Sequence, residues 1–351
     1  MTVPVVYDHT VASGAAQTTY SNTDISWEKT TVTNWGIDFS LFNNSFFGTF
    51  EYYIKKTDDI LMKLPIPKTM GLDASYQNAG ALENKGWDMT LGYRGNIGKF
   101  GYSVTGMLSD VKNKITSLSG SGPIYGTNTI TQEGSEINAI YGYVCEGIFQ
   151  TEEEIANHAT QTGGTIAPGD LKYKDLNEDG KIDSNDRTII GSTIPRYVYS
   201  LNISANYKDF DFSMLIQGVG KKDGMLYNDA IMPFYNGGKV QALHLDRWTP
   251  ENTDATFPRL TTTYANNREA SSFYVKSAAY LRLKNIQLGY SLPKSICGKT
   301  FIKRLRVYVS ADNLFQINNF WKGWDPEMPS VSSGNVYPQT KVISAGLDLN
   351  F

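Results

Sequence analysis

The stretch that decides the fold runs from Tyr197 to Ile216 and reads YVYSLNISANYKDFDFSMLI. Apolar and polar side chains alternate on both sides of the short Lys208-Asp209 segment. Side chains of a β-strand point alternately to opposite faces, so a period of two predicts strands with one apolar and one polar face. The stretch therefore predicts an antiparallel hairpin.

The same alternation recurs along the chain and predicts nine strands. They occupy about 28–41, 46–61, 83–94, 99–112, 196–207, 210–219, 278–291, 303–316 and 340–351. Most exceed the usual strand length of about 5–6 residues, and about 9–11 tilted residues are enough to cross a bilayer. Aromatic residues close the apolar faces, as Trp87 and Tyr93 do, which is typical of interfacial girdles. We therefore predict an all-β fold, an antiparallel transmembrane β-barrel.

Composition agrees with this fold and narrows the function. The 351 residues contain 22 Tyr, 16 Phe and 6 Trp, and the net charge of −3 argues against a nucleic-acid partner. By composition alone, a soluble β-sandwich or propeller remains an alternative. Two cysteines, Cys145 and Cys297, exclude a disulfide framework. Residues 1–5 lack a signal peptide, so we expect any export signal to lie upstream.

The connections between the predicted strands alternate between short and long. Outer-membrane barrels have short periplasmic turns and long extracellular loops. On that basis 1–27, 62–80, 113–195, 221–276 and 317–339 are predicted to be extracellular, and Cys145 and Cys297 lie on opposite sides of the membrane. Tyr141–Gln150 has a strand-like pattern but must stay within a loop to preserve this order. Nine is an odd number and a barrel cannot leave an edge unpaired in lipid, so residues 1–351 are predicted to form the C-terminal part of a barrel.

The sharpest local motif is the acidic segment 175–186, DLNEDGKIDSND. Its spacing is that of a calcium loop, with oxygen ligands at positions 1, 3, 5, 9 and 12, a glycine at 6 and a backbone carbonyl at 7. The predicted ligands of a Ca²⁺ ion are Asp175, Asn177, Asp179, Lys181 (through its carbonyl), Asp183 and Asp186. The alternative is an acidic loop built from Asx turns that needs no ion. Either way, the expected role is to stabilise a long loop.

Other candidate residues are weaker. The loop aromatics Trp321, Trp324 and Tyr235 are candidates for stacking on sugar rings or packing on peptides, with simple loop packing as the alternative. The polar strand faces predict a lumen lined by Asp38, Asp88, Ser200, Asn202, Asp211, Ser213, Asp348 and Asn350. No nucleophile, histidine pair or phosphate loop is visible, so we do not expect an enzyme. The terminal Phe351 resembles the barrel-assembly signal of outer-membrane proteins.

Several segments, in order from about residue 20 onward, resemble the C-terminal part of SusC/RagA-type TonB-dependent outer-membrane transporters. They include 27–39 (WEKTTVTNWGIDF), 52–61 (YYIKKTDDIL), 84–88 (NKGWD) and 146–150 (EGIFQ). The block 169–175 (GDLKYKD) leads into the acidic loop, and 280–286 (YLRLKNI), 305–310 (LRVYVS) and 323–327 (GWDPE) follow.

The resemblance implies active import of nutrients, glycan oligosaccharides or peptides, through the outer membrane of Bacteroidetes-type bacteria. It implies a SusD-like surface lipoprotein as partner, and energy from TonB-ExbB-ExbD acting on a plug domain. With the plug outside residues 1–351, the fragment is expected to be inactive alone. A passive porin or surface-binding barrel is the alternative.

Overall fold

The computed structural model describes residues 2–7, 10–15, 17–19, 21–64, 66–262, 266–293 and 302–351. Nine long strands form one antiparallel sheet in the order β22-β20-β19-β16-β15-β6-β5-β4-β3. In chain order these are β3 (Lys29–Leu41), β4 (Phe46–Lys63), β5 (Tyr76–Ile97), β6 (Phe100–Ser117), β15 (Arg196–Tyr207), β16 (Phe210–Lys221), β19 (Tyr280–Ser291), β20 (Arg304–Asn318) and β22 (Val342–Asn350). The nine predicted strands are therefore confirmed. Among the described residues, no helix is long and apolar enough to cross a membrane.

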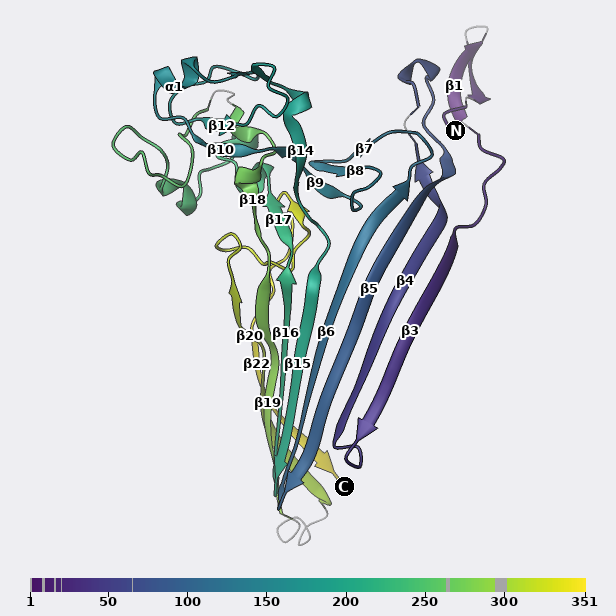
Figure 1. Cartoon of the computed structure of the whole chain (residues 1–351), viewed down its shortest axis with the longest axis vertical. Helices are drawn as coiled ribbons and strands as arrows, with labels where there is room; N and C mark the ends of the chain where they lie inside the picture. Colours follow the sequence, from purple (N-terminus) through teal and green to yellow (C-terminus); the bar gives the residue numbers. More distant parts are fainter. Residues whose placement is uncertain are drawn as a thin grey trace.

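Short turns and long loops lie at opposite ends of this sheet (Figure 1). The turn end carries the connections 42–45, 98–99 and 208–209, and the chain ends there after β22. The loop end carries 64–75, 118–195, 222–279 and 319–341. β5 begins at Tyr76, seven residues before the predicted start, because its pairing with β4 continues past a bulge at Asp58 and Asp59. The predicted turn near Cys297 lies outside the described residues.

Strand register divides the sheet into two faces, because directly paired residues point to the same side. One row on the apolar face is Ile37, Phe50, Met89, Leu108, Tyr199, Gly218, Leu281 and Ile317. The neighbouring row on the other face is Asp38, Thr49, Thr90, Met107, Ser200, Gln217, Arg282 and Gln316. We call these the outer and inner faces. Their segregation follows from the alternation in the sequence.

The loops at the other end fold into a packed unit, which we call the loop cap. Its strands are β7 (Ile124–Tyr125), β8 (Thr129–Thr131), β9 (Ala139–Tyr143), β10 (Cys145–Ile148), β11 (Thr160–Gln161), β12 (Leu171–Tyr173), β13 (Lys181–Ile182), β14 (Arg187–Gly191), β17 (Asp223–Leu226), β18 (Val275–Ser277) and β21 (Val331–Ser332). The helix α1 (Glu152–Ala156) begins at the N-cap Thr151, whose hydroxyl accepts a hydrogen bond from the amide of Glu154. Short 3-10 turns are η2 (Ser184–Asp186), η3 (Asn228–Ala230), η4 (Tyr235–Gly237), η5 (Ala242–Leu245), η6 (Asn266–Arg268) and η7 (Ser272–Tyr274).

Outside the cap, η1 (Lys68–Met70) lies between β4 and β5, and β1 (Thr2–Tyr7) and β2 (Thr10–Ala15) form a separate hairpin. Tyr141–Gln150, expected to stay out of the main sheet, contributes β9 and β10 to the cap.

The hydrophobic core of the described chain lies in the cap rather than in the sheet. Its members include Ile140, Leu171, Met225, Leu226 and Ile231, all fully buried. The buried Asp170 binds Arg259 through two hydrogen bonds of 2.8 and 2.9 Å and accepts a third, of 2.8 Å, from Asn267. A buried carboxylate is tolerated only when it is paired in this way. The loops 118–195 and 222–279 are thus held together as one body.

Candidate functional site, a polar wall joined to the loop cap

The outer face has the dimensions of a membrane-facing band. Along β5 its outward residues run from Trp87 to Ile97, ten residue steps or about 33 Å of strand. With a strand tilt of about 40°, that length spans about 25 Å along the barrel axis, which is the height of the apolar band of outer-membrane barrels. Aromatic rings border the band, with Trp35 stacked on Tyr52 near the loop end and Phe210 against Tyr290 near the turn end.

The inner face carries the polar residues that the sequence assigned to it. Asp38 and Asp88 share this face with Thr49 and Glu51, their paired neighbours in β4. Ser213 lies in a row of uncharged polar residues with Gln287, Ser310 and Ser344. Asp211 binds Arg306 with an Oδ1–Nε distance of 2.9 Å, so part of this polar surface is charge-paired across strands. Ser200, Asn202, Asp348 and Asn350 point to the same side by register.

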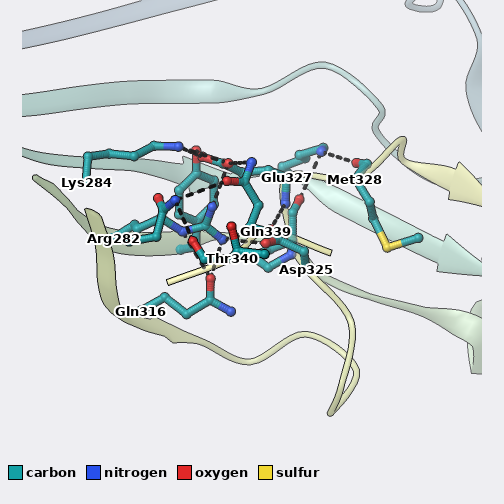
Figure 2. A network of polar contacts seen from close by, with 12 residues as sticks. Arg282, Lys284, Gln316, Asp325, Glu327, Met328, Gln339 and Thr340 are labelled. Carbon is teal, nitrogen blue, oxygen red and sulfur yellow. Dashed lines mark hydrogen bonds and ion pairs between the residues drawn. The ribbon is translucent and has the colours of Figure 1, made fainter. Parts of the chain in front are cut away.

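A network of ion pairs joins this wall to the loop 319–341 (Figure 2). At its centre is Arg282 of β19, whose side chain is 1% exposed. Its guanidinium donates hydrogen bonds of 2.8 Å to both carboxylate oxygens of Asp325 and one of 2.7 Å to Glu327. It also donates to Gln316 of the neighbouring strand β20, at 3.1 Å from Nε. The planar, five-donor guanidinium suits this many-sided contact, which a lysine ammonium does not match.

Glu327 also forms hydrogen bonds with residues other than Arg282. Its carboxylate accepts hydrogen bonds from Tyr280 at 2.6 Å, Lys284 at 3.1 Å and Gln339 at 3.1 Å. Burial favours its neutral form, but the Tyr280 and Lys284 hydrogen bonds and the nearby Arg282 charge outweigh it and hold the pKa of Glu327 below its ordinary value. Beside it, the buried Lys222 ammonium donates to the carbonyls of Pro326 and Met328. The segment 325–328 is therefore fastened to the wall from several sides.

Sequence reasoning gave these residues no role, although a signal was present. Arg282 stands between Leu281 and Leu283 in an alternating strand, so a charge had to lie on the inner face. Its partners lie 43 and 45 residues away in a loop, and no local pattern identifies them. The same holds for Asp170, whose partner Arg259 is 89 residues distant.

The acidic segment 175–186 forms a compact turn at the edge of the cap. Asp175 accepts hydrogen bonds from the amides of Glu178 and Gly180, both at 2.8 Å. Asp186 is fully buried and accepts from the amides of Leu176 and Asp183, also at 2.8 Å. Burial opposes ionisation of Asp186, but these backbone hydrogen bonds hold its pKa below the ordinary value. Gly180 has φ of 80°, a conformation that glycine adopts without strain.

The segment has oxygen donors of the types that calcium prefers. They are the Lys181 carbonyl and the side chains of Asp175, Asn177, Asp179, Asp183 and Asp186. Asn177 and Asp179 are also hydrogen-bonded to each other, with Asn177 Nδ2 donating to the Asp179 carboxylate at 3.1 Å. Within the described ranges, no three acidic, histidine or cysteine side chains converge as a metal cluster. The donor chemistry fits the ion, whereas the arrangement of the side chains is that of a backbone-capped turn.

The three predicted ligand-stacking aromatics lie in different environments. Trp321 is 6% exposed in the cap core, where its indole donates to the Tyr274 carbonyl at 3.3 Å and the Lys276 ammonium covers its ring. The Trp321 ring is thus packed in the core of the cap, where it has little free surface for stacking on a sugar. Trp324 and Tyr235 are half-buried and pack against the same core.

A cleft of about 570 Å³ lies elsewhere in the cap, between the β7–β8 hairpin, β9 and the end of the acidic segment. The Tyr125 and Tyr141 rings meet at its wall with centroids 5.7 Å apart, and Tyr125 is 64% exposed. Asn185 and Arg187 also line the cleft, and Arg187 is paired with Glu269 at 2.8 Å. The volume lies within the range of small-molecule sites. The sequence analysis did not single out this cleft.

Comparison with known proteins places this architecture in a family. The family model described as "TonB dependent receptor-like, beta-barrel" matches residues 6–314. TonB-dependent receptor P3 of Formosa agariphila is 31% identical over 99% of this chain and 36% of its own length. TonB-dependent receptor SusC of Bacteroides thetaiotaomicron is 27% identical over 94% of this chain and 32% of its own length. The chain thus spans about a third of the relatives it matches.

Among solved structures, that of the RagAB peptide transporter superposes with a TM-score of 0.81 at 25% identity, covering all of this chain and 38% of the other. The nine-stranded wall and the loop cap are thus a shared fold, and the resemblance to SusC and RagA is confirmed. The chain belongs to the TonB-dependent receptor β-barrel family, a family of transporters and receptors rather than enzymes.

Proposed function

We propose that this chain forms part of the barrel wall and the loop cap of an outer-membrane transporter that imports nutrients. The observation that carries the proposal is the single sheet with an apolar outer face, a polar inner face and a packed loop unit at one end only. A wall of this kind separates lipid from an aqueous lumen and exposes its loops on one side. We infer that the loop end is extracellular and the turn end periplasmic, in a Bacteroidetes-type outer membrane.

The imported substrate is an oligosaccharide or a peptide, and the partners are a SusD-like surface lipoprotein and TonB-ExbB-ExbD acting through a plug domain. Membership of the TonB-dependent receptor family and the similarity to SusC and to the RagAB peptide transporter support this assignment. We infer that a lipoprotein partner docks on the loop cap, because the cap is a folded body held rigidly to the wall through Arg282. The cleft beside Tyr125 and Tyr141 is the part of the cap best suited to contact substrate.

A Ca²⁺ ion in the segment 175–186 is a further part of this proposal, supported by the ligand spacing and the oxygen donors. Asp175, Asn177, Asp179, Asp183 and Asp186 with the Lys181 carbonyl would hold it. Bound there, the ion would neutralise a dense group of carboxylates and fix the loop that ends at η2.

Growth and uptake assays test the transport function. The gene for the full-length receptor is deleted and cells are tested on defined oligosaccharides and peptides as sole nutrients, followed by uptake of a labelled form of the one that supports growth. Loss of uptake, restored by the full-length gene and abolished in a strain without TonB, is expected. Expression of residues 1–351 alone is expected not to restore uptake.

The same assay separates the proposal from a passive porin. A porin needs no TonB and shows no saturation at low substrate concentration. Uptake that persists without TonB would therefore replace active import with passive diffusion.

A further inference from the structure

A group of lysines on the outer face lies directly beyond the aromatic border of the apolar band. In β5, Lys85 is two residues from Trp87 and points to the same side. Lys85 pairs in register with Lys112 of β6, and the next row places Lys114 opposite Glu83. Lys56 of β4 pairs with Glu83 from the other side. All four lysines are exposed.

One neighbouring acid, Glu83, is too little to balance the charges of the four lysines. Glu83 is 15% exposed and binds Lys85 at 2.7 Å, with Lys56 at 3.9 Å. Asp110, one row nearer the band, already forms an ion pair with Arg196 at 2.5 Å. Across the described ranges of the chain, neither Lys112 nor Lys114 forms an ion pair.

The facing lysines carry the argument. Directly opposed residues of antiparallel strands have Cβ atoms about 4.5–5.5 Å apart, and like charges in that position repel. The sheet keeps Lys85, which binds Glu83 at 2.7 Å, directly opposite Lys112, which has no acidic partner within the described ranges. Both lysines lie next to aromatic residues that mark the level of lipid headgroups. An anion between the two ammonium groups would convert this repulsion into attraction.

We propose that Lys85, Lys112 and Lys114, with Lys56 at their side, bind the phosphate of a membrane lipid in the leaflet that faces the loop end. The inference rests on the proposed membrane location of the sheet. The phosphate lies between the ammonium groups while the acyl chains continue over the apolar band below Trp87. The site is external to the lumen and independent of the imported substrate.

Lipid binding by the full-length receptor tests the site. The purified protein in detergent is titrated with a phosphorylated outer-membrane lipid A, with the same lipid after enzymatic removal of its phosphates, and with inorganic phosphate. The double variant K85Q/K112Q is compared with the matched control K55Q/K239Q. Lys55 is adjacent to Lys56 but on the opposite face of β4, and Lys239 is an exposed loop lysine.

Each lysine is expected to contribute about fivefold to the affinity, so K85Q/K112Q should weaken binding of the phosphorylated lipid about 25-fold. The control K55Q/K239Q should leave binding unchanged. Binding should also weaken as salt rises, because the lysines are exposed. Equal affinity for the dephosphorylated lipid would overturn the proposal in favour of acyl-chain contacts alone. Competition by inorganic phosphate at the lipid's own concentration would overturn it in favour of a free-anion site.

Folding is checked separately for every variant by the heat-dependent shift of the barrel on gel electrophoresis, and transport by nutrient uptake. Normal uptake with lost lipid selectivity supports the site. Normal uptake with unchanged selectivity in K85Q/K112Q refutes it and leaves the transport proposal standing. A protein that does not insert into membranes contradicts the proposed function itself.

Discussion

Replacing Arg282 with methionine is expected to release the loop 319–341 from the wall. The substitution keeps a long unbranched side chain but removes the cation shared by Asp325 and Glu327, which are 15% and 19% exposed. Removing one partner of a buried ion pair costs about 3–5 kcal/mol, because a carboxylate remains without compensation. Glu327 keeps its contacts with Lys284 and Tyr280, so we expect the lower end, about 3 kcal/mol.

Hydrogen exchange of the full-length receptor, measured by mass spectrometry, reports the loss of stability in the loop 319–341. A decrease of about 3 kcal/mol in the opening free energy speeds exchange of the amides in 319–341 more than 100-fold. Arg306→Met is the matched control, since Arg306 also pairs across strands, with Asp211, but within the described part of the chain forms no hydrogen bond or ion pair with this loop. The control should leave exchange in 319–341 unchanged.

A triple variant, R282M/D325N/E327Q, sharpens the test. It removes the uncompensated carboxylates together with the cation, and is expected to recover part of the lost protection. The reasoning is refuted if R282M exchanges at the wild-type rate in 319–341, or if the triple variant is no better protected than R282M. Lys in place of Arg282 should give an intermediate rate, because one ammonium cannot bind both carboxylates and Gln316.

Three further results are expected. The pKa of Glu327 is held below its ordinary value of 4.5, so its stabilising contribution is full above pH 4.5 and is lost as the pH falls through the folded pKa. Proteolysis within 319–341 should therefore accelerate only as the pH is lowered below 4.5, and should not change between pH 8 and 6. Burial raises the pKa of the Cys145 thiol to about 11, so little reactive thiolate is present at pH 7. In a C297S variant, a maleimide at pH 7 should therefore label the native protein slowly and the unfolded protein rapidly. Rapid labelling of the native protein would contradict the burial of Cys145. Calcium should slow protease cleavage within 175–186 and a chelator should reverse this, with the effect lost in D175N/D186N but kept in E178Q; cleavage insensitive to the chelator would favour the ion-free turn.

Local alternation was enough to predict the wall. The stretch from Tyr197 to Ile216 contains both faces and the turn, because a strand's side-chain direction depends only on the position of each residue along the chain. The same rule placed Asp38, Asp88 and Ser213 on the inner face. The acidic segment was likewise visible, since its hydrogen bonds join residues only a few positions apart.

Contacts between distant segments were beyond the sequence. Trp321 looked like an exposed loop aromatic, but the loops 118–195, 222–279 and 319–341 fold into one core around it. The pairing of Arg282 with Asp325, and of Asp170 with Arg259, depends on how those loops cross. Charged residues accept many partners, so their sequence positions do not specify which one is used.

The sequence by itself determined a sheet with one apolar and one polar face, because that property is periodic and local. Only the tertiary structure decided which side chains meet. The facing pair Lys85 and Lys112 illustrates the difference, because their register is set by the turn at 98–99 and by hydrogen bonds along two whole strands. A shift of one residue would have put either lysine on the inner face, so the charged group exists only at this register.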